Sequence, residues 1–332
     1  MTIEIVPATP ARRNPVTLFL FQNRRALSAL VIFLVMLGIF TLANPKVFLS
    51  PITYKAVFIS VPITIFLIVP MVFVITAGEI DLSFPATVGI TSWVFASALQ
   101  SGWDPFLALI PAIVAGLVTG LAVGILVTYV GLSSLVATLG MNYLLRGLIN
   151  IGTEGVGKQF PTMRDTALYQ LLAGRIDNLP VQVIWAVVFV IIGWALFNRH
   201  KFGAHIHFVG DNADSAREMG INVERVKIAA YVFMGFGAAM AGVLSVLVNL
   251  NWWPTTGDGL LLPALASVFI GGTPTWGGIG TVVGSAIGGF ITAFIETGII
   301  AAGLTGFFTQ FFHGLIIIVS LIGHRFNGPR YR

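Results

Sequence analysis

Ten long apolar segments restrict the folds open to this chain. Most approach the length of about 20 residues at which a helix crosses a bilayer. They cover residues 26–43, 57–77, 84–99, 106–130, 132–151, 181–197, 228–248, 260–270, 281–296 and 299–322. Only 9% of the 332 residues are charged, whereas a soluble domain carries roughly a quarter. The sequence therefore predicts an all-α integral membrane protein with about ten transmembrane helices.

The eighth segment is too short to cross alone, and residues 249–280 could instead form a re-entrant pair. Basic residues are unevenly divided between the two sides of this topology. One side holds Arg12, Arg13, Arg24, Arg25, Arg199, Lys201, Arg217, Arg225, Lys227, Arg325, Arg330 and Arg332, and the other holds Lys46, Lys55, Lys158, Arg164 and Arg175. Because basic loops stay in the cytoplasm, we expect both termini there. This gives an N-terminal tail over 1–25, a transmembrane domain over 26–322 and a C-terminal tail over 323–332.

Residues 198–227 form an extended charged segment between two apolar ones. Part of it, residues 214–219, is compatible with a short helix that begins with Asp214 as its N-cap and ends at Gly220. Such a helix, parallel to the membrane, can dock in a groove of a partner protein. The alternative is a solvated loop between two helices.

Two carboxylates and a hydroxyl, Glu79, Asp81 and Ser83, fall in a short break between apolar segments. Ionisable groups near membrane depth are costly and are therefore candidates for contact with a solute, an ion or a gate. The structural alternative is that Asp81 or Ser83 caps the next helix, with Pro85 in its first turn.

A second polar cluster contains Asn249, Asn251, Trp252, Trp253 and Asp258, where segment 228–248 reaches the outer face. Tryptophans at that depth are usually interfacial anchors. Amide and carboxylate groups beside aromatic rings would also suit a polyhydroxylated solute, so both interpretations stay open.

Residues 271–280 form a glycine-rich break that includes Trp276. Dense glycines permit left-handed backbone and close contact, either as a tight turn between helices or as the lining of a cavity or gate. Small residues four apart also mark helix-packing faces, within one subunit or as a dimer seam. These faces contain Gly116, Gly120 and Gly124, and Gly280, Gly284 and Gly288.

Several chemistries find no support in the sequence. The chain has no cysteine, and its five histidines lack zinc-like spacing. Residues 152–159 approach a phosphate-binding loop, but Gln159 replaces the Mg²⁺-binding hydroxyl residue and no strand precedes it. No nucleophile and base cluster suggests an enzyme, and the dispersed basic residues do not indicate nucleic-acid binding. We expect no metal and no cofactor on this chain.

Taken in order, three motifs resemble the permease subunit of ribose-type bacterial ATP-driven sugar importers. Residues 76–83 resemble the family's Gly-Ile-Asp-Leu-Ser signature, residues 202–223 its cytoplasmic coupling loop, and residues 271–280 its late glycine-rich segment. The resemblance runs from about residue 57 to 322. Glu79 stands where the family often has glycine, and Phe84 and Pro85 stand where Val-Gly is commoner, so the solute could differ and be a polyol.

The resemblance implies a permease in the bacterial inner membrane that pairs with itself or a related subunit. It also implies two cytoplasmic ATPase subunits, which would hydrolyse the ATP, and a periplasmic solute-binding protein. The residues that it places at the ATPase contact are Asp214, Ala216, Arg217, Glu218, Met219, Gly220 and Ile221.

An alternative from another class is an ion-coupled secondary transporter of a small polar solute. It would use Glu79, Asp81 or Glu296 as the coupling carboxylate. A facilitator channel is a third possibility. Either would work as a lone chain, whereas a permease of the importer class needs an ATPase.

Overall fold

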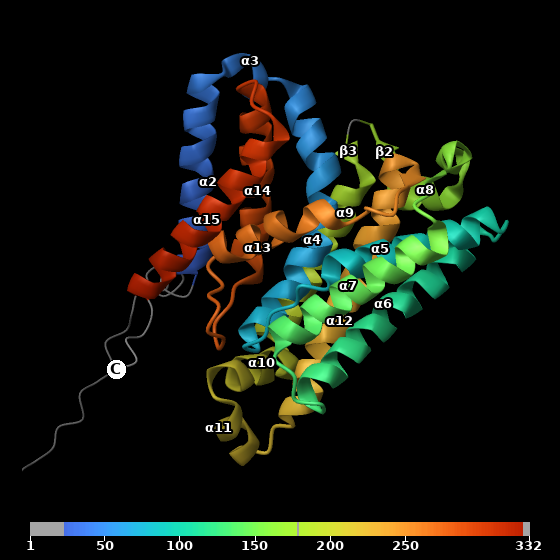
Figure 1. The fold of residues 1–332 in the computed structure, drawn as a ribbon. Helices are drawn as coiled ribbons and strands as arrows, with labels where there is room; N and C mark the ends of the chain where they lie inside the picture. Colours follow the sequence, from blue (N-terminus) through green and yellow to red (C-terminus); the bar gives the residue numbers. More distant parts are fainter. Residues whose placement is uncertain (1–22, 178, 328–332) are drawn as a thin grey trace, which may run out of the picture.

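A computed structural model describes residues 23–177 and 179–327, and the predicted tails lie largely outside them. One helix matches each of the ten apolar segments (Figure 1). These helices are α2 (Arg24–Ala43), α4 (Pro51–Thr76), α5 (Phe84–Gln100), α6 (Pro105–Thr128), α7 (Ser134–Thr153), α9 (Val181–Asn198), α12 (Val223–Asn249), α13 (Leu261–Ile270), α14 (Val282–Ala301) and α15 (Gly306–Asn327). Among the described residues, seven are long and apolar enough to cross a membrane: α2, α4, α6, α9, α12, α14 and α15. The predicted all-α membrane class is confirmed.

Short elements connect these helices. They are α3 (Pro45–Phe48), η1 (Pro161–Asp165), α8 (Ala167–Leu172), η2 (Asp258–Leu260) and four two-residue strands, β1 (Lys158–Gln159), β2 (Arg175–Ile176), β3 (Leu179–Pro180) and β4 (Asn251–Trp252). β1 pairs antiparallel with β4, so the loop after α7 is joined to the loop after α12. Within residues 249–280 the structure has one short helix, α13, preceded by η2.

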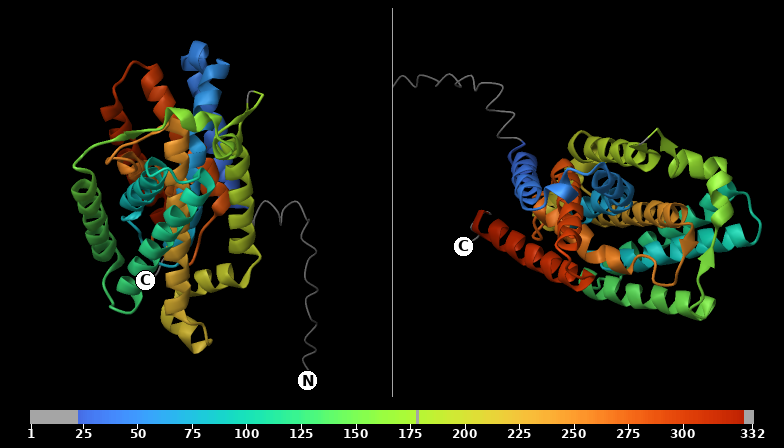
Figure 2. Two further views of the ribbon diagram at one scale, coloured as in Figure 1. Left: turned by 90° about the vertical axis from the view of Figure 1, so that its right-hand side faces the viewer. Right: turned by 90° about the horizontal axis from the view of Figure 1, so that it is seen from above.

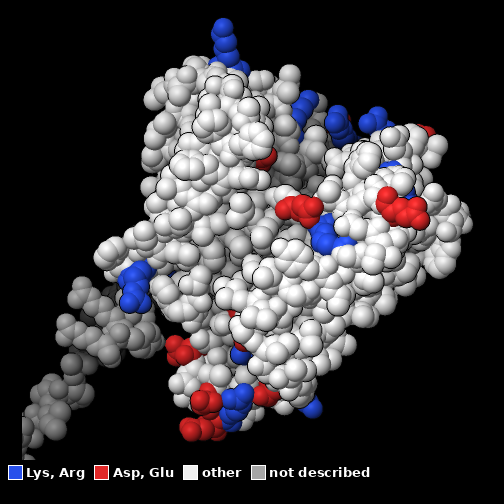
Figure 3. All heavy atoms as spheres, in the orientation of Figure 1, with Lys and Arg blue, Asp and Glu red and all other residues white. Residues whose placement is uncertain are grey.

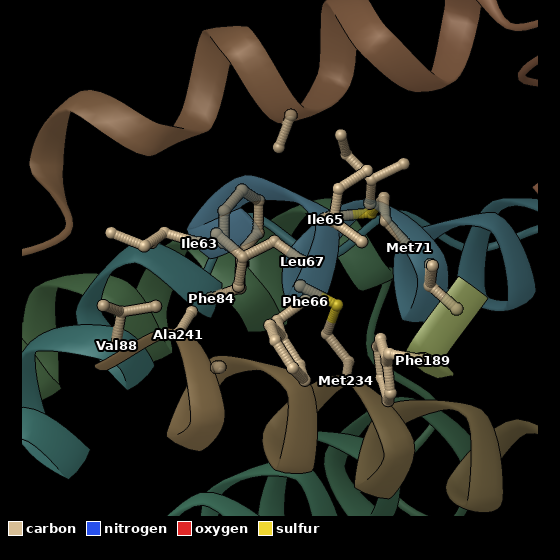
Figure 4. Packing of buried hydrophobic residues seen from close by; sticks show 14 of the residues in the cluster. Ile63, Ile65, Phe66, Leu67, Met71, Phe84, Val88, Phe189, Met234 and Ala241 are labelled. Carbon is tan, nitrogen blue, oxygen red and sulfur yellow. The ribbon is translucent and has the colours of Figure 1, made fainter. Parts of the chain in front are cut away.

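Helix α4 lies at the centre of the bundle. Its most apolar window is 78% buried, against 6% for α2 and for α15 at the periphery. A helix that is apolar on all sides is expected in a core, and α4 packs against α9, α12 and α14. Figure 4 shows side chains of α4 beside Phe189 of α9 and Met234 of α12. Seen from above, α2 and α15 lie on the side of the bundle away from α8 (Figure 2). The centre is therefore apolar protein, and the rim is free to face lipid.

The predicted packing glycines bring helix backbones close together inside this one chain. A Cβ at Gly116 would overlap the carbonyl oxygen of Gly235, and one at Gly120 would overlap that of Tyr231. A Cβ at Gly124 would lie 3.0 Å from the Cα of Ile228. Side chains here would separate α6 from α12, because membrane helices approach closely only through small residues.

The glycines of α14 do the same on the other side of the bundle. A Cβ at Gly284 would overlap the carbonyl oxygen of Gly271, and one at Gly288 would overlap that of Ser267 in α13. Gly280, just before α14, lies against the hydroxyl of Thr76. The C-terminal end of α13 is thereby fixed to α14.

The charged segment 198–227 contains two helices, α10 (Lys201–Asp211) and α11 (Ala213–Glu218). The sequence predicted a helix near α11 but missed α10, whose glycine and histidine content obscures its periodicity. Asp214 was wrong as the N-cap. The cap is Asn212, whose side-chain oxygen accepts hydrogen bonds from the N–H groups of Asp214 and Ser215, both at 3.0 Å. Asn212 has extended backbone directly before the first turn, so its side-chain oxygen reaches forward to these N–H groups, whereas Asp214 already lies inside that turn.

Candidate functional site

Three motifs that are far apart in the sequence meet at one end of the molecule. The N–H of Gly278 donates to the carbonyl oxygen of Thr76 at 2.8 Å. The ring Nδ1 of His207 lies 2.9 Å from the carbonyl oxygen of Gly278. The end of α4, helix α10 and the glycine-rich segment are thus joined by hydrogen bonds.

Glycines allow this contact to be made by backbone alone. A Cβ at Gly210 would overlap the carbonyl oxygen of Thr76, and one at Gly277 would lie 2.5 Å from the carbonyl oxygen of Gly210 and 3.1 Å from the Cα of Gly78. Gly78, Gly277 and Gly278 also have φ of +84°, +83° and +70°, a region that other residues rarely adopt. We call Thr76, Gly78, Gly210, Gly277 and Gly278 the glycine junction.

The two predicted carboxylates beside this junction both have partners. Glu79 pairs with Lys227 of α12 at 2.5 Å, and the two side chains are only 12% and 20% exposed. Buried Asp81 accepts from the N–H of Ser83 at 2.7 Å and from its hydroxyl at 2.6 Å. Ser83 occupies the N-cap position of α5, with Pro85 in the first turn, but its hydroxyl binds Asp81 rather than the helix.

Helix α11 ends as a glycine-terminated helix should. Gly220, at φ +82°, donates to the carbonyl oxygen of Arg217 at 2.9 Å, and Ile221 donates to that of Ala216 at 3.0 Å. These are the two hydrogen bonds of a Schellman motif. Buried Ala216 fixes the inner face of α11, while Met219 is 56% exposed.

The outer face of α11 carries charge. Arg217 bridges Asp214 at 2.9 Å and Glu224 at 2.8 Å. The pKa of Arg217 is raised above its usual value, mainly by its hydrogen bond to Glu224. We call Asp214, Arg217, Glu218 and Met219 the α11 surface. In Figure 3 charged atoms gather over this lower end, below a broad uncharged region.

A polar cleft of about 590 Å³ opens beside the middle of α4 and the C-terminal end of α12. It contains four of the residues predicted for a solute pathway, Asn249, Asn251, Trp253 and Asp258. Its other polar side chains come from α4, α12, the loop after β4, α14 and α15. They are Ser60, Thr64, Ser245, Thr255, Thr256, Thr292, Glu296, Thr309, Gln310 and His313.

The polar cleft offers many hydrogen-bonding groups and few charges. Hydroxyls and amides both donate and accept, which suits an uncharged solute rich in hydroxyl groups. His313 is only 2% exposed, and its Nε2 has no hydrogen-bond partner among the described residues. Ser60 and Thr64 of α4 were not predicted as cleft residues, since their only signal is a hydroxyl within an apolar segment.

Arg146 of α7 fixes the rim of the polar cleft. Its guanidinium pairs with Asp258 at 2.5 Å and donates to the carbonyl oxygens of Pro254 at 2.7 Å and Pro85 at 2.9 Å. Asp258 is therefore an ion-pair partner at the rim. The loop after β4 is held onto the first turn of α5.

The other two tryptophans predicted for the solute pathway, Trp252 and Trp276, lie away from the polar cleft. Trp252 is fully buried, and its indole N–H donates to the hydroxyl of Ser92 at 3.0 Å. Trp276 lines a different cavity, where its ring meets His324 edge-on. The candidate pathway residues are thus divided among the glycine junction, the polar cleft and these two separate places.

The glycine junction lies at the C-terminal end of the buried helix α4, and the polar cleft lies beside the middle of the same helix. Thr64 lines the cleft and Thr76 forms part of the junction. Twelve residues of α-helix separate them, about 18 Å at 1.5 Å per residue. Helix α12 also runs between the two, from Lys227 to Asn249.

Apolar helices around a polar cleft, with a charged helical segment at one end, define a multi-pass membrane protein built for transport. A family model described as "Branched-chain amino acid transport system / permease component" matches residues 53–321. The chain belongs to this permease family, and the resemblance deduced from its motifs is confirmed. It is a permease and not an enzyme.

Named relatives cover nearly the whole chain. The ribose import permease protein RbsC of Bacillus subtilis is 31% identical over 285 residues, 86% of this chain and 88% of the relative. The autoinducer 2 import system permease protein LsrC of Photorhabdus luminescens is 29% identical over 305 residues, 91% and 90% of the two chains. The LsrD protein of the same type of system in Salmonella typhimurium is 29% identical over 318 residues, 92% of each chain.

Proposed function

We propose that this chain is the membrane subunit of an ATP-driven importer that carries a sugar or polyol across the bacterial inner membrane. The observation that carries the proposal is the attachment of the α10–α11 segment, by main-chain contacts, to the end of the central helix α4. The polar cleft beside the middle of α4 supports a solute rich in hydroxyls. Relatives named for ribose import and autoinducer 2 import support the same substrate class.

The partners in this proposal are two cytoplasmic ATPase subunits, a second permease subunit and a periplasmic solute-binding protein. The α11 surface enters a groove of the ATPase, with Arg217 and Glu218 as charged contacts and Met219 as an apolar one. Aromatic residues, Met and Arg are the residue types enriched at such interfaces. ATP hydrolysis takes place on the partner, and this chain carries no cofactor.

The proposed topology has about ten membrane segments, with the short helix α13 among them and both termini in the cytoplasm. The basic residues of the 198–227 segment then lie inside, as the positive-inside rule requires. Residues 1–25 and 323–332 form cytoplasmic tails. The dimer is formed with a second copy or a related chain.

In the proposed mechanism, closure of the ATPases moves α11, and the glycine junction passes this movement to α4. Rotation of α4 and α12 then opens the polar cleft first to one side of the membrane and then to the other. Contacts in the cleft are weak enough to release solute, and selectivity resides mainly in the periplasmic receptor.

A pull-down of the tagged chain from mild detergent tests the proposal. An ATPase subunit should accompany the wild-type chain and be lost with R217A/E218A. The matched control is R164A/D165A, a neighbouring pair of opposite, exposed charges in η1 on the predicted outer side, which should retain the subunit. Equal recovery from both variants would overturn the assignment of the α11 surface.

The ion-coupled alternative now depends on a single residue. Glu79 and Asp81 have partners and lie at the junction, whereas Glu296 lines the polar cleft. Uptake by the lone chain in liposomes with an ion gradient and no ATP, abolished by E296Q, would support that alternative. Uptake that requires the ATPase and ATP would exclude it.

A further inference from the structure

A second cavity, of about 810 Å³, lies between α2, α15 and the segment leading into α14. Its lining changes character from one end to the other. At one end, α2 contributes Arg24, Arg25 and Ser28, and antiparallel α15 contributes Ser320 and His324. We call this cavity the peripheral groove, and this its basic end.

The other end of the peripheral groove is apolar. Its lining side chains are Ile32 and Met36 of α2, Ile291 and Ile295 of α14, and Leu315 of α15. From Arg24 to Met36, α2 rises about 18 Å at 1.5 Å per residue. A ligand along this groove would have a negative or polar head and an apolar tail that extends toward the middle of the membrane.

The position of the groove favours a lipid as that ligand. Helices α2 and α15 are the least buried of the candidate spans and lie at the rim of the bundle (Figure 2), so the groove is reached from the hydrocarbon. A basic pocket between helices at a membrane surface is a typical site for an anionic headgroup. No carboxylate lines it among the described residues.

Two further observations indicate a phosphate at the basic end. Arg25 donates to the carbonyl oxygen of Gly272 at 3.2 Å, which orients the guanidinium and uses one of its five donors. The Nδ1 of His324 is buried and has no hydrogen-bond partner among the described residues. A phosphate between these side chains would receive guanidinium hydrogen bonds, the geometry in which arginine binds phosphate best.

We propose that the peripheral groove binds an anionic phospholipid, with its phosphate at Arg24, Arg25 and His324 and an acyl chain along Ile32, Met36 and Ile295. Bound there, the lipid would fill the space between α2 and α14 and hold α15 to the bundle. The proposal depends on the membrane location of the chain and not on its solute or its ATPase.

Trp276 lines the groove and provides the test. The full chain is reconstituted in nanodiscs of phosphatidylcholine that contain a small fraction of lipid with brominated acyl chains, which quench nearby tryptophan. The Trp276 signal is taken as the difference between wild type and Trp276→Phe. Brominated phosphatidylglycerol should quench it strongly, and brominated phosphatidylcholine at the same fraction only weakly.

Removing the two guanidinium groups should weaken this quenching. With each basic residue contributing about 1 kcal/mol of attraction, R24Q/R25Q should require roughly 30-fold more phosphatidylglycerol. R24K/R25K should recover most of the difference, because it retains the charges. R199Q/K201Q, which removes two basic residues outside the groove, should behave as wild type. Arg12 and Arg13 remain in these three substituted variants to preserve the orientation.

Three results would overturn the proposal. One is equal quenching by the two lipids, and another is quenching by phosphatidylglycerol that R24Q/R25Q leaves unchanged. The third is quenching that appears only after deletion of residues 1–22, or only in the separated monomer, which would mean that the chain's own N-terminal segment or a second copy occupies the groove. Phosphatidylglycerol that survives on the wild-type chain in native mass spectrometry, but not on R24Q/R25Q, would support it independently.

Discussion

Glu79 shows how one residue can connect two elements that are distant in the sequence. Its carboxylate reaches Lys227 across 148 positions of sequence. The pair is mostly buried, and each side chain would be left as an uncompensated charge without the other. The ion pair thus ties the start of α12 to the turn between α4 and α5.

We expect E79Q to lower the free energy of unfolding by about 2 kcal/mol, less than the 3–5 kcal/mol of a fully buried broken pair because both groups retain some solvent. The double variant E79Q/K227Q should be less destabilised than the sum of the single variants. Unfolding in mixed micelles measures this. D214N, at an exposed ion pair, is the control and should change stability by less than about 0.5 kcal/mol. An E79Q protein as stable as wild type would show that the ion pair between Glu79 and Lys227 does not stabilise the fold.

At the scale of elements, α11 depends on its cap. A helix of six residues is not stable alone, so the two hydrogen bonds to Asn212 matter. N212A should cost about 1 kcal/mol and raise hydrogen exchange at the amides of Asp214 and Ser215 by roughly fivefold. N212D retains an acceptor and should exchange as wild type. Unchanged exchange in N212A would mean that packing, not the cap, holds α11.

The α6–α12 contact offers a second test at this scale. Gly120→Leu places a side chain where the backbone of Tyr231 lies, so the two helices must separate. We expect loss of the monodisperse protein in size-exclusion chromatography. Gly140→Leu is the control, because a Cβ at Gly140 meets nothing within 4 Å. If both variants elute alike, the close approach of α6 and α12 is not needed for folding.

These elements also show what the sequence can predict. Apolar runs located all ten main helices, since burial in a bilayer needs apolar length, and Gly220 marked the end of α11. Helix α10 was missed because Gly203 and Gly210 argue against a helix, yet each is glycine because another backbone lies against it. The polar residues of α4, α14 and α15 meet in one cleft only because these distant segments pack together. No local sequence pattern predicts that packing.

At the scale of the whole molecule, the absence of cysteine makes orientation testable. Ser101 ends α5 on the side away from the glycine junction, and Ser215 is exposed on α11. A membrane-impermeant maleimide should label S101C in intact spheroplasts and S215C only after permeabilisation. The wild-type chain is the blank. The opposite pattern would reverse the proposed topology and move the α11 surface away from any cytoplasmic ATPase.

The glycine junction has a consequence for how force travels through the molecule. Side chains absorb small displacements by changing rotamer, whereas main-chain atoms in contact cannot. Gly210 contacts the backbone of Thr76, and Gly277 contacts the backbone of Gly210. A displacement of α10 therefore reaches α4 without being absorbed by side chains. The glycine junction is stiff because it contains almost no side chains. A single added methyl group would either block the movement of α10 against α4 or separate the two backbones.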